Sequence, residues 1–206
     1  LNPASPAPLS GMRQGFRLLA ERPELITLES PRAVTAEFRS GEAASPAQTL
    51  HQPHGLLHHR LLIPGETVSV VLHAAPPGEL SGALALHRQP PDPMTEGMGE
   101  RYVLPPGGAR LFQFELSKPG LTGVGVNASR GTVEGRLYNA QGKALGEGVT
   151  QRHDLKPGTY YLLIWTAREG DAAEIRPVLL GTNPPTGVPD NVVQRFRALA
   201  VPPSGS

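Results

Sequence analysis

Histidine is the residue type in this sequence that is both suited to chemistry and clustered. Four of the seven histidines lie at positions 51, 54, 58 and 59, and imidazole is a frequent ligand of transition metals. Pro53 and Gly55 exclude a helix that would present His54 and His58 on one face. In an extended strand, His58 and His59 point to opposite faces. A metal site would therefore need a second strand that brings another imidazole beside one of them.

A tight hairpin at Pro64-Gly65 would supply that second strand. Such a turn places His58 opposite Val71, with His73 one diagonal step away on the same face. His58 and His73 are therefore the candidate metal ligands. No carboxylate or cysteine completes the set, so the pattern favours structural or solvent-facing histidines. We expect no stoichiometric metal and no other cofactor.

Residues for nucleophilic or general acid–base catalysis form no recognisable set. The sequence has no Gly-x-Ser-x-Gly elbow and no phosphate-binding Gly-x-x-x-x-Gly-Lys-Ser/Thr loop. The absence of cysteine excludes thiolate nucleophiles, iron–sulfur clusters and disulfides. His153 and Asp154 are adjacent, which turns their side chains apart, and a turn is the simpler interpretation. Spacing singles out no pair of Glu for glycoside cleavage, so we expect no catalytic residues and a protein that is not an enzyme.

Aromatic residues are the candidates for ligand or partner contact. Tyr160, Tyr161 and Trp165 belong to one run, and alternation places Tyr161 and Trp165 on the same face. That face would be a stacking platform for sugar rings or part of a packed core, and core packing is the more frequent role of such residues in a sandwich. Phe196, near the end of the sequence, is a third candidate for partner contact.

The elements that must position these residues are short β-type runs. The 206 residues include 24 Gly and 23 Pro, so the backbone turns often. A first set of runs occupies 25–29, 33–39, 56–63, 67–73 and 80–87. The turns between them, at Ser30-Pro31, Pro64-Gly65 and Pro76-Pro77-Gly78, are interpreted as hairpins. Residues Ser40 to His54 are small and polar without a period, which predicts a long surface loop.

A second set of runs follows a Pro-rich, linker-like stretch at 89–97. It occupies 101–104, 110–116, 121–127, 132–138, 143–146, 159–165 and 174–180. The run 159–165 is apolar on both faces, so we expect it at the centre of a sheet or beneath a neighbouring layer. The predicted fold class is all-β, with two small antiparallel β-sandwich modules, Ig-like or jelly-roll-like, and short flanking helices.

Both ends of the sequence are Pro-rich and adjoin short helical patterns. Met12, Phe16 and Leu19 share one face of a helix that Ser10 would cap, and Phe196 lies on the apolar face of a second helix over 192–199. Such ends predict further chain on either side. We therefore expect a Pro-rich leader and short helix at 1–24, a first β module at 25–98, a second β-sandwich module at 99–183, and a short helix with a Pro/Ser-rich tail at 184–206.

Several runs of the second set follow a recognisable order. They are Phe112-x-Phe114-x-Leu116, then Pro119-Gly120-Leu121, LYNAQGKAL at 137–145 and LKPGTYYL at 155–162. Over roughly 100–181 this order resembles the bacterial pre-peptidase C-terminal domain. The resemblance implies an eight-stranded sandwich attached to a secreted hydrolase or another envelope protein, usually without catalytic activity. Some members bind calcium through acidic residues before the Leu-Tyr strand. This sequence has GTVEGR at 131–136 instead, so we do not expect the calcium binding of those members here.

Charge and hydropathy exclude two classes of partner. The 19 Lys and Arg and 18 Asp and Glu are spread along the chain, which leaves no basic stripe for nucleic acid, and no stretch is apolar for long enough to span a bilayer. We expect a non-catalytic interaction or structural module of a larger bacterial cell-envelope or secreted protein. It would act in adhesion, scaffolding or assembly, in the periplasm, at the cell surface or outside the cell, through other protein chains or other domains of its parent. The alternative is a carbohydrate-binding accessory module of a secreted hydrolase, with a glycan as its partner.

Overall fold

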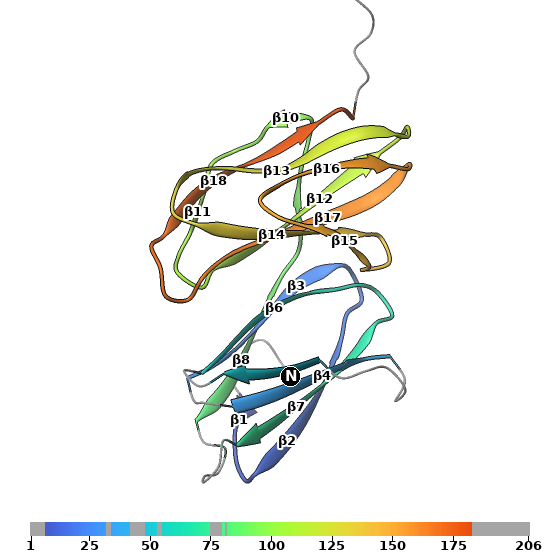
Figure 1. The fold of residues 1–206 in the computed structure, drawn as a ribbon. Helices are drawn as coiled ribbons and strands as arrows, with labels where there is room; N and C mark the ends of the chain where they lie inside the picture. The colour runs from blue at the N-terminus through green and yellow to red at the C-terminus, as the bar shows by residue number, and fades with distance from the viewer. Residues whose placement is uncertain are drawn as a thin grey trace, which may run out of the picture.

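The computed structural model describes residues 7–31, 34–41, 48–52, 55–74, 80 and 82–182. Over these residues the chain is all-β, with eighteen strands and no helix (Figure 1). The prediction of an all-β protein is therefore confirmed. No helix long and apolar enough to span a membrane occurs in the described part of the chain.

The first half of the chain builds two four-stranded sheets, here called the first sheet pair. Their strand orders are β1-β8-β3-β6 and β2-β7-β4-β5, with antiparallel neighbours throughout. The bounds are β1 Ala7–Pro8, β2 Arg13–Leu19, β3 Glu24–Ser30, β4 Val34–Ser40, β5 Gln48–Gln52, β6 Leu56–Leu62, β7 Thr67–Ala74 and β8 Ala83–Gln89.

The rest of the described chain builds two five-stranded sheets, the second sheet pair, which Figure 1 shows above the first. One has the order β10-β18-β13-β16, with β11 also paired to β18, and the other the order β15-β14-β17-β12-β9. Only β9 and β12 pair in parallel among these strands. The bounds are β9 Asp92–Pro93, β10 Gly97–Met98, β11 Tyr102–Leu104, β12 Ala109–Leu116, β13 Gly120–Arg130, β14 Val133–Asn139, β15 Ala144–Glu147, β16 Thr150–Leu155, β17 Gly158–Thr166 and β18 Ala173–Leu180.

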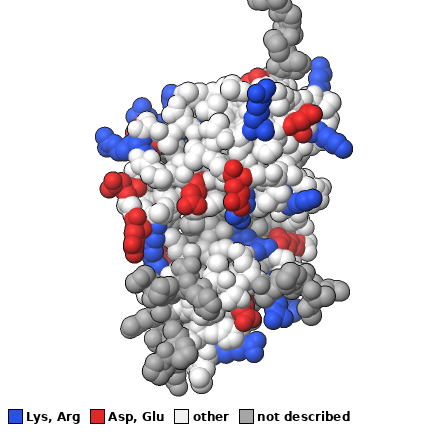
Figure 2. Space-filling view, viewed as in Figure 1, with Lys and Arg blue, Asp and Glu red and all other residues white. Residues whose placement is uncertain are grey.

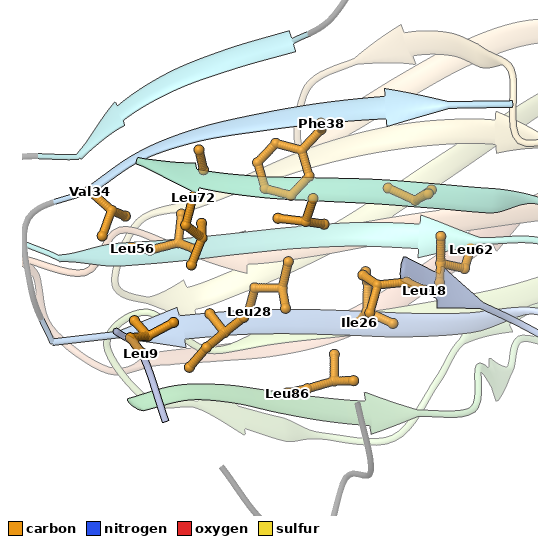
Figure 3. Close-up of a cluster of buried hydrophobic side chains, with 14 of the residues drawn as sticks. Leu9, Leu18, Ile26, Leu28, Val34, Phe38, Leu56, Leu62, Leu72 and Leu86 are labelled. Carbon is orange, nitrogen blue, oxygen red and sulfur yellow. The ribbon is translucent and has the colours of Figure 1, made fainter. Parts of the chain in front are cut away.

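Each sheet pair encloses its own apolar core. In the described chain, sixteen buried hydrophobic residues from both four-stranded sheets form the first cluster, and Figure 3 shows Phe38 and Leu28 within it. A second cluster of sixteen joins both five-stranded sheets and includes Phe114 and Leu162. Because successive side chains of a strand point to opposite faces, strands such as β4, β7 and β12 contribute every second residue to a core. Burial of one such side chain stabilises the fold by about 1.5–3 kcal/mol.

The helix predicted to carry Met12, Phe16 and Leu19 is wrong. Residues Arg13–Leu19 form β2, which pairs with β7 in antiparallel register. Leu18, which the helical interpretation did not use, is fully buried, whereas Leu19 is exposed. The pattern of burial has a period of two because the segment closes one edge of a sheet, and this tertiary pairing overrides a weak local helical pattern.

The long loop predicted for Ser40 to His54 is also wrong in part. Residues Gln48–Gln52 form β5, an edge strand that pairs with β4. A similar strand, β16, was not predicted at all and pairs with β13. Both strands are polar in sequence because each has only one neighbour in its sheet and a face open to water, and such strands carry little hydrophobic signal.

The hairpins predicted for the first set of runs are wrong wherever the structure describes them. Pro64-Gly65 makes a turn, with Glu66 N–H donating to the Ile63 carbonyl at 3.1 Å, but the strands on either side, β6 and β7, lie in different sheets. The strands before and after Ser30-Pro31, β3 and β4, are likewise in different sheets. Turn residues specify that the chain reverses. Whether the returning strand pairs beside the first or crosses to the facing sheet depends on how the two sheets pack around their shared core.

The linker-like stretch at 89–97 contributes to the second sheet pair. Asp92 and Pro93 form β9 beside β12, and Gly97 and Met98 form β10 beside β18. The helix predicted over 192–199 and the C-terminal tail lie outside the described residues.

Candidate functional site

A third buried cluster, the seam, lies between the two sheet pairs. It consists of Leu25 of β3, Leu61 of β6, Leu111 of β12, and Tyr161 and Leu163 of β17. Leu25 lies directly opposite Leu61 in the first sheet pair, and Leu111 lies directly opposite Leu163 in the second. Two cross-strand leucine pairs thus supply four of the five buried side chains.

The seam explains why β17 is apolar on both faces. Tyr160 and Leu162 point into the second core, whereas Tyr161 and Leu163 belong to the seam. β17 is also central in its sheet, between β14 and β12. The prediction that this run is central or covered by a neighbouring layer is confirmed, because both conditions hold.

Polar contacts flank the seam. Arg168, which follows β17, donates from Nη1 to the Gly55 carbonyl at 2.9 Å, and its Nη2 lies 3.5 Å from Glu29 Oε1. Gly107 has φ +69° and sits so close to Leu57 that a Cβ at this position would lie 2.8 Å from Leu57 Cδ2. Residues 55–57 and the segments at 107 and 168 are thus in contact across the two sheet pairs.

A pocket of about 320 Å³, here called the junction pocket, opens beside the seam. Its walls come from β5 and β6 of the first sheet pair and from β14, β17 and residues 167–168 of the second. His58, Arg136, Tyr138 and Trp165 line it. A neighbouring pocket of about 290 Å³ shares His59 with it and extends to His87. Pockets at such interfaces are where small-molecule sites most often occur.

His58 lies at the end of the junction pocket that is next to the first core. Its ring centroid is 4.2 Å from that of Phe38, a residue of the first core. Burial lowers the pKa of His58 to about 4, and the positive charges of Arg60 and Arg136 act in the same direction. Its Nε2 is buried without a hydrogen-bond partner among the described residues. His58 is therefore a neutral imidazole at pH 7 with one unsatisfied polar atom.

His59 points the other way, toward the outer face of the same sheet. Its Nδ1 is 2.9 Å from the hydroxyl of Thr27, and His87 is the residue directly opposite Thr27 on the next strand. Burial lowers the pKa of His59 to about 4, opposed in part by a hydrogen bond to the backbone of Gly107. A segment of the second sheet pair therefore contributes to the environment of a histidine in the first.

The outer face of β14 supplies the remaining polar wall. Arg136 Nη2 is 2.5 Å from Glu147 Oε1, and its guanidinium carbon is 6.0 Å from the centre of the Trp165 ring. Burial raises the pKa of Tyr138, whereas the nearby Arg136 lowers it. Arg136 Nε is buried and has no hydrogen-bond partner among the described residues.

The metal pairing considered for His58 and His73 is not formed. β6 pairs with β3, so His58 lies opposite Leu28, while His73 lies on β7 in the other sheet with Nε2 3.3 Å from Glu37 Oε1. In the described part of the chain, no group of three or more His, Cys, Asp or Glu could hold a metal ion.

The candidate aromatic residues have different surroundings. Tyr161 is 4% exposed within the seam, and Trp165 packs against the seam from its edge and lines the junction pocket. They share a face, as predicted, but the first sheet pair covers it. Phe196 lies outside the described residues. Sequence reasoning missed Arg136 and Tyr138, and the available signal was their alternation with the buried Leu137, which points them to the face that adjoins Trp165.

Comparisons with known proteins identify no family. No family model matches the chain, and no curated protein matches it. Among solved structures, it is similar to the 11S allergen from Cocos nucifera L., with 8% identity over 94% of this chain and 83% of that chain, and a TM-score of 0.19. A score this low carries no argument about fold or function.

Proposed function

We propose that this chain is a non-catalytic structural and interaction module of a larger bacterial cell-envelope or secreted protein. Its two sheet pairs are two β-sandwich modules, and the seam joins them into one rigid element. Such an element acts in scaffolding, adhesion or assembly by holding its partners at a fixed spacing. The partners are other protein chains or other domains of the parent protein, in the periplasm, at the cell surface or outside the cell.

The seam is the observation that carries this proposal. Domains joined by a linker alone move relative to each other unless their interface is substantial and apolar. Here five buried side chains, including Leu61 and Leu111, form an apolar contact, and Arg168 adds a hydrogen bond and an ion pair across it. A flexible tether needs none of these contacts.

The surface and the sequence resemblance give further support. On the face that Figure 2 shows, basic and acidic side chains are interspersed, which suits contact with protein better than contact with the phosphates of nucleic acid. The resemblance of 100–181 to the pre-peptidase C-terminal domain points to an appended, non-catalytic module. The segment that carries the resemblance spans β11 to β18.

Distance measurements between spin labels test the rigidity. The chain has no native cysteine, so Met12→Cys and Leu121→Cys give one unambiguous label each. Met12 is 73% exposed and directly precedes β2, and Leu121 is 51% exposed on β13. A rigid element gives a single narrow distance distribution in pulsed electron paramagnetic resonance. A broad distribution in the doubly labelled parent chain contradicts the proposal.

A seam variant supplies the matched comparison. Adding Leu61→Ala and Leu111→Ala to the labelled chain removes two of the five buried side chains, so the distance distribution should broaden while each sandwich keeps its β signal in circular dichroism. An unchanged narrow distribution would show that the seam does not hold the two modules together.

A carbohydrate-binding accessory module of a secreted hydrolase is the second candidate. Trp165 favours it, because an aromatic ring at a pocket stacks against sugars. Tyr161 weighs against it, because the seam covers its ring. A glycan-array screen separates the two functions: binding to neutral glycans that Trp165→Ala abolishes would favour the second.

A further inference from the structure

The junction pocket combines properties that a packing defect does not need. It has about 320 Å³, at the lower end of the range for small-ligand pockets, roughly 300–1,000 Å³. That volume fits a single ring with one or two substituents. Both sheet pairs contribute to its walls, so it exists only where the two are joined.

The walls divide into an apolar part and a cationic part. Trp165 and Tyr138 offer aromatic surface, and Leu57 and Leu163 add aliphatic surface. Arg136 and Arg168 supply positive charge, while none of the residues that line the pocket is acidic. Each arginine has an acidic partner outside the lining, Glu147 for Arg136 and Glu29 for Arg168. The pocket thus suits a ligand with an apolar ring and a negative group.

Three polar atoms of residues that line the pocket have unsatisfied hydrogen-bonding capacity. His58 Nε2, His59 Nε2 and Arg136 Nε are buried without hydrogen-bond partners among the described residues. An unsatisfied buried polar group destabilises a fold by about 1–3 kcal/mol and is rare enough to call for an explanation. All three belong to residues that line the same pocket, beneath its accessible surface.

We propose that the junction pocket binds a small organic carboxylate of about monosaccharide size, its ring against Trp165 and Tyr138 and its carboxylate toward Arg136. A guanidinium and a carboxylate form the strong, charge-assisted type of hydrogen bond. The proposal goes beyond the structural function, which stands or falls on the rigidity of the seam.

Trp165 makes the test direct, because it is the sole tryptophan of the chain. Tryptophan fluorescence of the full chain is followed while benzoate, glucuronate, glucose or inorganic phosphate is added at constant ionic strength. We expect saturable changes with benzoate or glucuronate and none with glucose or phosphate. Benzoate and glucuronate distinguish an aromatic acid from a sugar acid as the source of the carboxylate.

Arg136→Gln is the variant that tests the cationic wall. It should weaken the carboxylate affinity at least tenfold, because a charge-assisted hydrogen bond is lost. Arg152→Gln is the matched control, since Arg152 is exposed on β16 and does not line the pocket, and its affinity should equal that of the parent. Equal loss in both variants, or none in Arg136→Gln, overturns the assignment.

Nuclear magnetic resonance of the parent chain covers the case in which Arg136→Gln does not fold. Ring signals of His58 should shift with the carboxylate at the same midpoint as the fluorescence, while those of His153, on β16, stay unchanged. The proposal is overturned if neither carboxylate gives a saturable change up to about 50 mM, a limit that corresponds to less than about 2 kcal/mol of binding. An equal response to glucose, or a response to phosphate alone, also overturns it.

Discussion

The two cores and the seam bury the same kinds of side chain in different settings. Each core holds sixteen buried hydrophobic residues from two facing sheets within the described chain, whereas the seam holds five. Each core lies between the sheets of one pair, and the seam lies between the two pairs. We therefore expect the cores to fix the stability of each sheet pair, and the seam to fix the position of one pair relative to the other.

Neighbouring leucines of β17 give the largest expected effect on this comparison. Leu162 is fully buried in the second core, and Leu163 is 2% exposed in the seam. Leu162→Ala should lower the free energy of unfolding by about 2–5 kcal/mol. Leu163→Ala should lower it less, because the two sheet pairs can close over the lost volume. Urea denaturation measures both, and an equal or larger effect of Leu163→Ala would show that the seam is part of one continuous core.

Acid should weaken the region around the junction pocket. The pKa of His58 is about 4 in the folded chain and about 6.5 in the unfolded chain, so between these values the unfolded chain binds a proton that the folded chain does not. The contribution of neutral His58 to the free energy of unfolding is complete above pH 6.5. As the pH falls toward 4, about 3 kcal/mol of this free energy is lost. His59 acts in the same direction.

His58→Gln isolates that effect. The variant should lose less stability than the parent chain between pH 7 and pH 4, measured by urea denaturation at each pH. If both chains lose the same free energy of unfolding, His58 is not the group that senses acid. A ring titration of His58 with a midpoint near 6.5 would contradict the buried, neutral state directly.

Substitution of two glycines with similar φ angles tests the contact across the seam. Gly107 and Gly65 have φ +69° and +79°, so replacement by Ala strains the backbone at both positions. A Cβ at 107 would also lie 2.8 Å from Leu57 Cδ2, whereas nothing lies within 4 Å of one at 65. Gly107→Ala should therefore lower the thermal midpoint further, by an extra destabilisation of about 1 kcal/mol. Equal midpoints would mean that Leu57 moves aside freely.

The smallest expected effect concerns the polar rim. Arg168→Gln removes the ion pair to Glu29 across the seam, and Arg101→Gln removes one to Glu174 within the second sheet pair. Exposed ion pairs contribute about 1 kcal/mol or less, so both variants should unfold almost like the parent. Only Arg168→Gln should broaden the distribution of distances between spin labels at 12 and 121. Broadening in both variants would show that the effect is not specific to the ion pair across the seam.

The sequence by itself determined the class of the fold and most of its strands. Alternation of Phe112, Phe114 and Leu116 with Gln113 and Glu115 specifies one buried face, because a strand has a period of two. The run 159–165, which is apolar on both faces, also predicted a strand covered on both faces. The polar edge strands β5 and β16 were not predicted, because edge strands need little apolar surface. The helix predicted to carry Met12, Phe16 and Leu19 is instead β2, because pairing with β7 overrides a weak local helical pattern.

Only the tertiary structure decided which strands are neighbours and what lies against the outer face of β17. A turn such as Pro64-Gly65 reverses the chain equally well for a hairpin and for a crossing to the facing sheet, and its residues do not distinguish the two. The crossing separated His58 from His73 and placed His58 near Arg136 instead. Clusters that join residues far apart in sequence, such as the seam with Leu25 and Leu163, depend on how the two sheet pairs pack. No local pattern encodes that arrangement, so the junction pocket could not be predicted from the sequence.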